Sequence, residues 1–318
     1  MDQMLQYQVA KAYYLDNLGQ QEIANRFGLS RPKVSRVLKE ARESGMVQIT
    51  ITPPVDITPD FLPQQLQRLL NIDQVDVVDT LSVSADNLAQ RLQFLVVFTA
   101  KKVPALLGAA RYVGLGWGNT IYQTVMGMDF RSSPSDVCFV PLVGNAGLSD
   151  PAYQTNSIVE RAAEKFKGKR LFLNAPAFVT EPSVRQFLLN EDKMVEMRQM
   201  WERLDTAVFG LGVSLKNASV IMDAIGNADF VQTILSKEPV GDILGHYFTR
   251  DGRFCLGKKD ALGITISKDV FRKIPKRVCV AMGEEKVDAI LAANQMGAYT
   301  HLITDTYTAM ELIRKGTR

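Results

Sequence analysis

The sequence QQEIANRFGLSRPKVSRVLKEARESG, residues 20–45, decides how the N-terminal part of this chain folds. Apolar residues at helical spacing predict one helix over about 20–27 and a second helix after Gly28, where glycine tolerates the positive φ of a tight turn. Ser30 is a preferred N-cap residue, and Pro32 suits the first helical turn because its missing N–H is not needed there. The stretch therefore predicts helix, tight turn, helix.

The flanking residues extend this motif. Residues 3–16 carry apolar side chains at helical spacing and predict a preceding helix. Gly45 is expected at the C′ position that ends the last helix. The alternation over 46–51 then predicts a short strand or wing. Two helices joined by a glycine turn, the second one capped and amphipathic, are typical of a winged helix-turn-helix that binds DNA.

Positive charge is concentrated on the second helix of the motif. Its basic residues are Arg31, Lys33, Arg36, Lys39 and Arg42, against Glu40 and Glu43. The resulting local charge of +3 equals the formal net charge of the whole chain, so the remaining residues sum to zero. A duplex phosphate backbone is the usual partner of such a helix. The alternative, a solvated basic face on an ordinary helical pair, explains the charge but not the turn, cap and wing together.

Position along the second helix predicts the role of each side chain. Residues near its start are expected to approach base edges in the major groove: Ser30, Arg31, Lys33, Ser35 and Arg36. Lys39 and Arg42 lie farther along and are expected to meet phosphates.

Composition limits the other possibilities. The 318 residues are 46% hydrophobic and 22% charged, as in an ordinary globular protein of two or more folding units. No apolar run is long enough for a membrane span, and no signal-peptide pattern opens the chain. Three distant cysteines and two histidines match neither a disulfide framework nor a metal motif. We therefore expect a cytoplasmic protein without a metal or other cofactor.

A proline-rich stretch separates two domains. Pro53, Pro54, Pro59 and Pro63 interrupt regular structure, so we predict a DNA-binding domain over 1–52, a linker over 53–63 and an effector and oligomerisation domain over 64–318. A short helix over 64–70 has an apolar stripe. That stripe is expected to pack either on its own chain or on another subunit.

The large domain alternates apolar strands with amphipathic helices. Strands are predicted over 75–78, 112–116, 137–143, 170–173, 206–211, 277–282 and 300–303. Helices are predicted near 84–101, 119–127, 156–167, 183–203, 227–236, 286–296 and 306–315. This alternation predicts an α/β fold, a doubly wound parallel sheet covered by helices. Ligands of such sheets bind at the carboxyl ends of the strands, near a topological switch point.

The strand at 112–116 leads into a glycine loop. Gly116, Gly118, Asn119 and Thr120 stand where the backbone can approach a ligand and the first helical amides can hold an anion. A tight strand-to-helix turn without a ligand is the alternative. The loop is not a dinucleotide fingerprint, because Asn119 occupies the place of the third glycine.

Amides and a carboxylate follow other strands. After the loop Gly144-Asn145-Ala146-Gly147, the side chains of Asn145, Gln154 and Asn156 would bind hydroxyls or simply cap a helix. Asp242, beside Gly241, would accept two sugar hydroxyls or serve as an ordinary turn aspartate.

A lysine stands at the start of a later helix. Lys286 falls in the first turn of the predicted helix 286–296, where a cation is disfavoured by roughly 0.3–1 kcal/mol. A bound phosphate would offset this cost, and Glu284 and Glu285 would offset it less well. The alternative is an exposed lysine without a ligand.

Seven ordered segments resemble one protein family over essentially the whole chain. They are QQEIANRFGLSRPKVSRVLKEARESGMV, VGLGWGNT, PLVGN, APAFV, VGDILGHYF, GEEKVDAI and HLITDTYTAMELI. The chain thereby resembles the SorC family of bacterial sugar-binding transcriptional regulators. The resemblance implies a winged helix-turn-helix and an effector domain similar in fold to sugar-phosphate isomerases. It also implies a tetramer that binds operator DNA and responds to a sugar, polyol or sugar phosphate.

By motif position, the resemblance assigns the glycine loop and Lys286 to an anion and Asp242 to sugar hydroxyls, with Asn145, Gln154 and Asn156 as neighbours. Met282 departs from the family, which often has a second glycine there, and leaves room for an unphosphorylated effector.

Two other functions remain open from the sequence. One is a sugar-phosphate isomerase or deaminase with an added helix-turn-helix, although no acid/base pair is recognisable and we expect no enzyme. The other is a DNA-binding structural protein without an effector.

Overall fold

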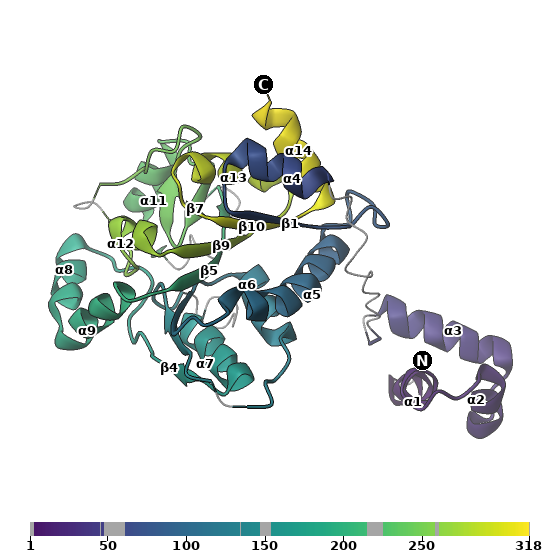
Figure 1. Ribbon diagram of the computed structural model, residues 1–318. Helices are drawn as coiled ribbons and strands as arrows, with labels where there is room; N and C mark the ends of the chain where they lie inside the picture. Colours follow the sequence, from purple (N-terminus) through teal and green to yellow (C-terminus); the bar gives the residue numbers. More distant parts are fainter. Residues whose placement is uncertain are drawn as a thin grey trace. The chain divides into compact units, whose positions relative to one another are not determined.

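The computed structural model describes residues 3–44, 46–47, 61–133, 135–146, 154–214, 225–257 and 261–317. Its internal contacts divide the chain into two compact units, Met1–Thr52 and Pro53–Arg318. The N-terminal unit is drawn in purple in Figure 1. Each unit is described by itself below.

The described part of the N-terminal unit contains three helices: α1 (Gln3–Tyr14), α2 (Gln20–Phe27) and α3 (Arg31–Glu43). Their apolar faces meet in one small core, built mainly from Val9, Ile23, Ala24, Val34, Val37, Leu38 and Ala41. These are the residues that recur at helical spacing, so burial of one face of each helix stabilises the unit.

The turn between α2 and α3 has the predicted geometry. Gly28 takes a φ of 63°, and its N–H donates to the carbonyl of Ala24. The Ser30 hydroxyl accepts the N–H of Lys33 at 3.4 Å, which confirms the predicted N-cap. At the C-terminal end of α3, the Ser44 N–H donates to the backbone carbonyl of Glu40 at 2.8 Å.

Other predictions for this region cannot be compared with the structure. Gly45 and most of the predicted strand 46–51 lie outside the described residues, as does most of the linker 53–63.

A seven-stranded parallel sheet forms the centre of the large unit. Its spatial order is β1-β10-β9-β5-β2-β3-β4. The strands are β1 (Gln74–Val78), β2 (Tyr112–Leu115), β3 (Cys138–Pro141), β4 (Lys169–Arg170), β5 (Thr206–Gly210), β9 (Lys276–Val280) and β10 (His301–Asp305). The predicted α/β class and parallel sheet are confirmed. The adjacent strands β2 and β5 lead to opposite halves of the sheet, which makes the gap between them a switch point.

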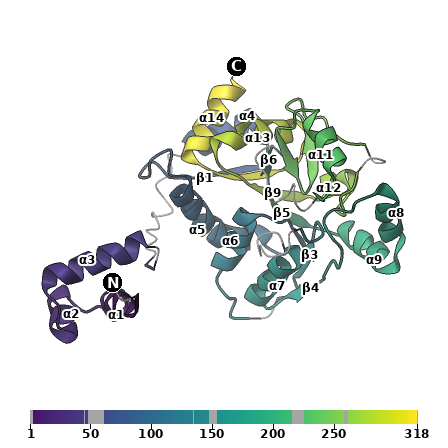
Figure 2. The same ribbon diagram turned by 180° about the vertical axis from the view of Figure 1, so that it is seen from behind.

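Helices cover both faces of this sheet. Figure 1 shows one layer on each side of the strands, and Figure 2 shows the same arrangement from behind. One layer contains α4 (Phe61–Leu70), α13 (Val287–Gln295) and α14 (Thr306–Gly316), and the other contains α5 (Leu88–Leu107), α6 (Asn119–Gly127) and α7 (Thr155–Phe166). The apolar stripe of α4 packs within its own chain, because Leu66 and Leu70 are buried and α4 contacts β1 and α14.

A buried ion pair fixes the start of α5 to the sheet. Arg91 Nε lies 2.6 Å from Asp305 Oδ2, at the carboxyl end of β10, and both side chains are fully buried. The Arg91 guanidinium also stacks on Tyr307, 4.7 Å from the ring centre. Removing one partner of such a pair would leave an uncompensated buried charge, so the pair holds α5 in register with β10.

The helix predicted over 183–203 is wrong as a single element. The structure has α8 (Pro182–Asn190) and α9 (Asp192–Trp201), separated by Glu191 in an extended conformation. The break lets α9 bury Met194, Met197 and Trp201, whereas α8 has no buried residue. Tertiary packing of α9 therefore overrides the continuous helical pattern.

A second, small sheet was not predicted. It is antiparallel and contains β6 (Gly212–Val213), β7 (Gly241–Ile243) and β8 (His246–Phe248). Two helices near it are α11 (Ala228–Leu235) and α12 (Lys268–Lys273), of which α12 was also not predicted. The start of the predicted helix 286–296 differs as well, because a 3₁₀ turn η3 (Glu284–Lys286) precedes α13. Within the described ranges, no helix combines the length and apolarity that crossing a bilayer requires.

Candidate functional site

A cavity of about 280 Å³ opens at the carboxyl ends of β2, β5 and β9. It lies at the switch point, the place where ligands of doubly wound sheets bind. Its polar lining comprises Asn119, Thr120, Asp242, Glu285 and Lys286. Its apolar lining comprises Leu88, Leu92, Trp117, Leu211, Val213 and Met282. Backbone of Gly118, Gly210 and Gly212 completes the lining.

Asp242 is held in a fixed position beside this cavity. Gly212 stands opposite it in the β6–β7 pair, and a Cβ on Gly212 would collide with the carboxylate. The other carboxylate oxygen accepts the Gly245 N–H at 2.8 Å, so Asp242 also closes the β7–β8 turn. Burial raises the pKa of Asp242 to about 6, against the opposing effects of the Gly245 bond and Lys286. A buried, oriented carboxylate of this kind is a strong acceptor for ligand hydroxyls.

Lys286 faces the same cavity from the end of η3. Burial lowers its pKa, whereas the nearby carboxylates of Glu285 and Asp242 act in the opposite direction. Its neighbour Glu285 also lines the cavity and was not predicted as a site residue. Glu285 directly precedes Lys286 in the sequence, but the predicted helix 286–296 gave no reason to expect the Glu285 side chain in the cavity, because its position depends on the 3₁₀ turn η3.

The two glycines of the loop after β2, Gly116 and Gly118, have different roles. A Cβ on Gly116 would press on Leu244 and Phe209 at 2.9 and 3.1 Å, so Gly116 allows close packing and does not line the cavity. Gly118 does line it, with a φ of 104° at the N-cap of α6 and no side-chain cap bond. Asn119 and Thr120 follow in the first turn of α6. The amide groups of that turn can therefore donate to a ligand.

The three amide side chains do not line this cavity. Asn145 Oδ1 accepts the Asn156 N–H at 3.1 Å near the start of α7. Asn156 in turn accepts the Leu173 N–H at 2.9 Å and donates to the Leu173 carbonyl at 3.2 Å. Gln154 occupies the N-cap of α7 without a side-chain cap bond. Asn145 Oδ1 thus accepts an amide of the first turn of α7, and Asn156 fastens α7 to the segment after β4.

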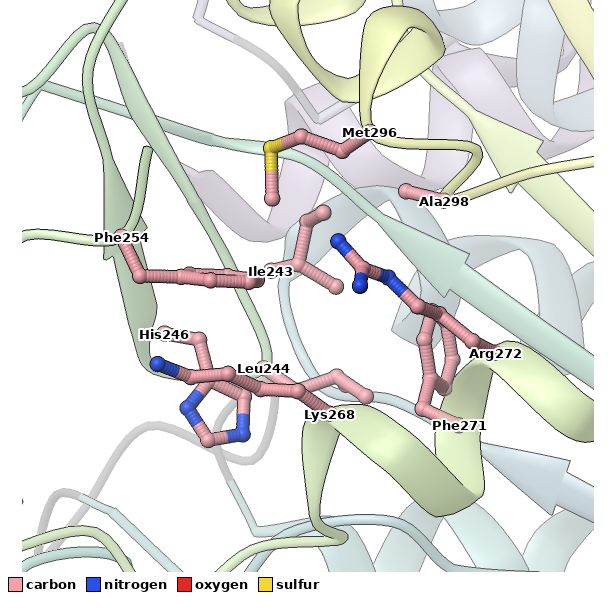
Figure 3. Close-up of a pocket in the computed structure, with 9 residues that line it drawn as sticks. All are labelled: Ile243, Leu244, His246, Phe254, Lys268, Phe271, Arg272, Met296 and Ala298. Atoms are coloured by element: carbon pink, nitrogen blue, oxygen red, sulfur yellow. The ribbon is translucent and has the colours of Figure 1, made fainter. Parts of the chain in front are cut away.

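A second, much smaller cavity lies between the β7–β8 hairpin and α12 (Figure 3). Its volume of about 20 Å³ is on the scale of a single water molecule. Lys268 Nζ lies 3.8 Å from the centre of the Phe254 ring, and Figure 3 shows Met296 on the other side of that ring. These contacts describe packing, so this cavity is no candidate for a carbohydrate.

Neither histidine lies in the first cavity. His246 bonds through Nε2 to the Ile266 carbonyl at 2.9 Å, and burial lowers its pKa to about 4. His301 Nδ1 contacts the Thr300 hydroxyl at 2.8 Å on β10. Both rings are bound to the protein itself, which gives the enzyme alternative no histidine base at the site. The described acidic, histidine and cysteine side chains also form no group of three or more that would hold a metal ion.

The N-terminal unit presents a second candidate surface on α3. The buried face contains Val34, Val37, Leu38 and Ala41. The residues predicted to contact DNA are all exposed: Ser30, Arg31, Lys33, Ser35, Arg36, Lys39 and Arg42. One helix thus has an apolar side toward its own core and a basic side toward solvent, the arrangement of a recognition helix.

Curated relatives match this chain over nearly its whole length. The sorbitol operon regulator of Klebsiella pneumoniae is 26% identical, with 96% of each chain covered. The deoxyribonucleoside regulator of Bacillus subtilis is 27% identical, covering 98% of this chain and 97% of the relative. The transcriptional regulator LsrR of Escherichia coli K12 is 28% identical, covering 96% and 93%. All three are regulators by name.

Solved structures and a family model agree with these relatives. The full-length sorbitol operon regulator SorC of Klebsiella pneumoniae matches with a TM-score of 0.73 and 25% identity, covering 98% of this chain and 99% of that one. A transcriptional regulator from Streptococcus pneumoniae, at 22% identity and a TM-score of 0.73 over 81% of this chain and 97% of that one, has the same fold. Residues 59–314 match the family model described as "Putative sugar-binding domain". The chain therefore belongs to this sugar-binding domain family, as a member of the SorC family of transcriptional regulators.

Proposed function

We propose that this protein is a DNA-binding transcriptional regulator of a carbohydrate-use operon, controlled by a sugar, polyol or sugar phosphate. The observation that carries the proposal is that the chain combines a basic recognition helix in one unit with a switch-point cavity in another. The regulators named above cover both units, which supports the same combination of tasks.

The two units take separate roles in this proposal. Residues 1–52 bind operator DNA through α3. Residues 64–318 bind the effector and associate into a tetramer, and residues 53–63 form the linker between the two domains. In the cavity, Asp242 accepts effector hydroxyls, while Lys286, Asn119, Thr120 and the amides after Gly118 donate. Binding changes operator affinity by a coupling that is typically about 1–3 kcal/mol. A tetramer contains several DNA-binding domains, so avidity amplifies the change in operator affinity. The protein acts in the cytoplasm, where the DNA is.

The test is operator selection followed by effector screening. The purified full-length protein is incubated with sheared genomic DNA at low ionic strength, and enriched fragments are sequenced. Fluorescence anisotropy then measures fragment affinity with each candidate carbohydrate. We expect a small set of enriched fragments and one carbohydrate class that changes their affinity about 5- to 150-fold. Absence of any enriched fragment would contradict the DNA-binding role, and enrichment that no carbohydrate alters would favour a DNA-binding protein without an effector.

A further inference from the structure

The charges in the switch-point cavity do not suit a phosphate. Among the described residues that line it, the charged side chains are Asp242, Glu285 and Lys286, and no arginine is present. Two carboxylates therefore face one ammonium group. A phosphate monoester carries about −1.5 to −2 charges at pH 7 and is normally bound by several cationic or amide donors. Here it would enter a site whose described side chains carry two carboxylates against one ammonium group.

Glu285 occupies the loop where an anion would be expected. A Cβ on Gly283 would run into both carboxylate oxygens of Glu285, so this carboxylate lies directly over the backbone of Gly283. Gly283 has a φ of 109° and begins the 3₁₀ turn that presents Lys286. The protein thus places its own carboxylate above the loop, and the charge on Lys286 lies in the field of both Glu285 and Asp242.

The remaining walls suit an uncharged carbohydrate. Leu88, Leu92, Trp117 and Met282 form an apolar side, against which the C–H groups of a sugar or polyol can pack. Met282 is only 7% exposed and lines the same cavity. The volume of about 280 Å³ lies just below the usual range of roughly 300–1,000 Å³ for drug-sized ligands, which favours a ligand as small as a single sugar unit.

The N-terminus of α6 does not reverse the excess of negative charge among the described lining residues. A helix N-terminus is equivalent to a partial charge of roughly +0.5, which is less than the full charge of either carboxylate. Its amide groups donate to a neutral hydroxyl as readily as to a phosphate oxygen. The first turn of α6 therefore orients an uncharged ligand without selecting for an anion.

We propose that Glu285 is a specificity-determining residue, which makes the effector an uncharged sugar or polyol and excludes its phosphate monoester. This inference rests on the proposed function and names the effector class of the same cavity. Asp242 and Lys286 bind the hydroxyl groups, and Glu285 repels a phosphate at the Gly283 loop.

The experiment compares matched ligand pairs on the full-length protein. Each hexose, pentose and polyol is tested against its own terminal phosphate monoester by thermal shift and then by calorimetry. The variants are Glu285→Gln and, as a matched control, Glu284→Gln, which removes the same charge from the same 3₁₀ turn but from a side chain that does not line the cavity. Both glutamates are exposed, so neither substitution disturbs the core.

We expect the wild-type protein to bind one parent carbohydrate at least about tenfold more tightly than its phosphate. Glu285→Gln should reduce this preference about tenfold through a gain in phosphate affinity, and Glu284→Gln should leave it unchanged. Tighter wild-type binding of a phosphate than of its parent overturns the inference while leaving the proposed function intact. An unchanged preference in Glu285→Gln also overturns it. If no member of any pair binds, the inference and the proposed effector control fail together.

Discussion

Asp242, the residue that we propose binds effector hydroxyls, lowers the stability of the folded protein when it is ionised. Its pKa is about 6 because burial penalises the carboxylate, compared with 3.8 for an ordinary aspartate. The folded state therefore binds a proton more tightly than the unfolded state does. The contribution of Asp242 to stability is therefore largest below about pH 4, falls as the pH rises to about 6, and is constant above that. An ionised Asp242 at neutral pH therefore lowers the stability of the fold, as expected of a residue that we propose binds the effector.

We predict that Asp242→Asn raises the stability of the ligand-free protein. Asparagine keeps an acceptor for the Gly245 N–H but removes the buried charge. The gain should be absent near pH 4 and grow to on the order of 2–3 kcal/mol above pH 6. Urea unfolding followed by tryptophan fluorescence measures it, because Trp117 and Trp201 both lie in the large unit.

Asp251→Asn is the control for this prediction. Asp251 is exposed, and its bonds to Thr249 and Arg253 lower its pKa to about 2, so its loss should not stabilise the protein at any pH. The same carbohydrate that stabilises the wild type should have no effect on Asp242→Asn. A variant that is less stable than the wild type above pH 6 would show that the carboxylate is stabilised in the fold.

At the scale of elements, α3 is the helix that we propose recognises DNA. Its N-cap, buried face and basic face could all be predicted from residues 20–45, because capping and helical periodicity are local properties. The same is true of α6, which begins at Asn119 as predicted because Gly118 precedes it. Local chemistry determined these elements, and tertiary structure did not change them.

We predict different losses from two substitutions on α3. Arg36→Ala should cost about 1–3 kcal/mol in specific operator binding, because Arg36 lies one turn from the helix start, where side chains approach base edges. Lys39→Ala should weaken binding to every sequence and reduce the slope of log affinity against log salt by roughly one. Anisotropy titrations on operator and unrelated DNA at several salt concentrations separate the two effects. If Arg36→Ala weakens binding to the operator and to unrelated DNA equally, Arg36 does not read a base, and Arg31 or Lys33 is the expected base-reading residue.

Other elements could not be predicted because long-range contacts determine them. Glu191 breaks the helix pattern of 183–203 so that α9 can pack, and no local signal marks that break. The strands of the small antiparallel sheet have two or three residues each, too few for a periodic pattern. Asp242 could be proposed as a site residue from its glycine neighbour, but Glu285 could not, because its position depends on the 3₁₀ turn before α13.

At the scale of the whole molecule, function requires communication between two units. The chain divides at Thr52, with a separate hydrophobic core on each side. If the effector binds in the large unit and DNA binds to the N-terminal unit, as we propose, a change in one unit must alter the affinity of the other. Linkage also requires reciprocity: operator DNA must change effector affinity by the same factor as the effector changes DNA affinity.

Lys286→Ala should separate these two activities. Loss of the ammonium group removes a donor to the effector and leaves Asp242 without its nearby cation, so the effector should no longer change DNA affinity. Operator affinity without effector should stay within about twofold of the wild type, because Lys286 belongs to the other unit. Lys193→Ala is the control, since Lys193 is exposed on α9 and pairs only with Glu196 among the described residues.

Anisotropy with and without effector, and calorimetry of the effector with and without operator, give both coupling factors. Equal factors in the wild type, and no coupling in Lys286→Ala, are expected. A Lys286→Ala protein that still responds to the effector would show that the binding site lies elsewhere in the large unit.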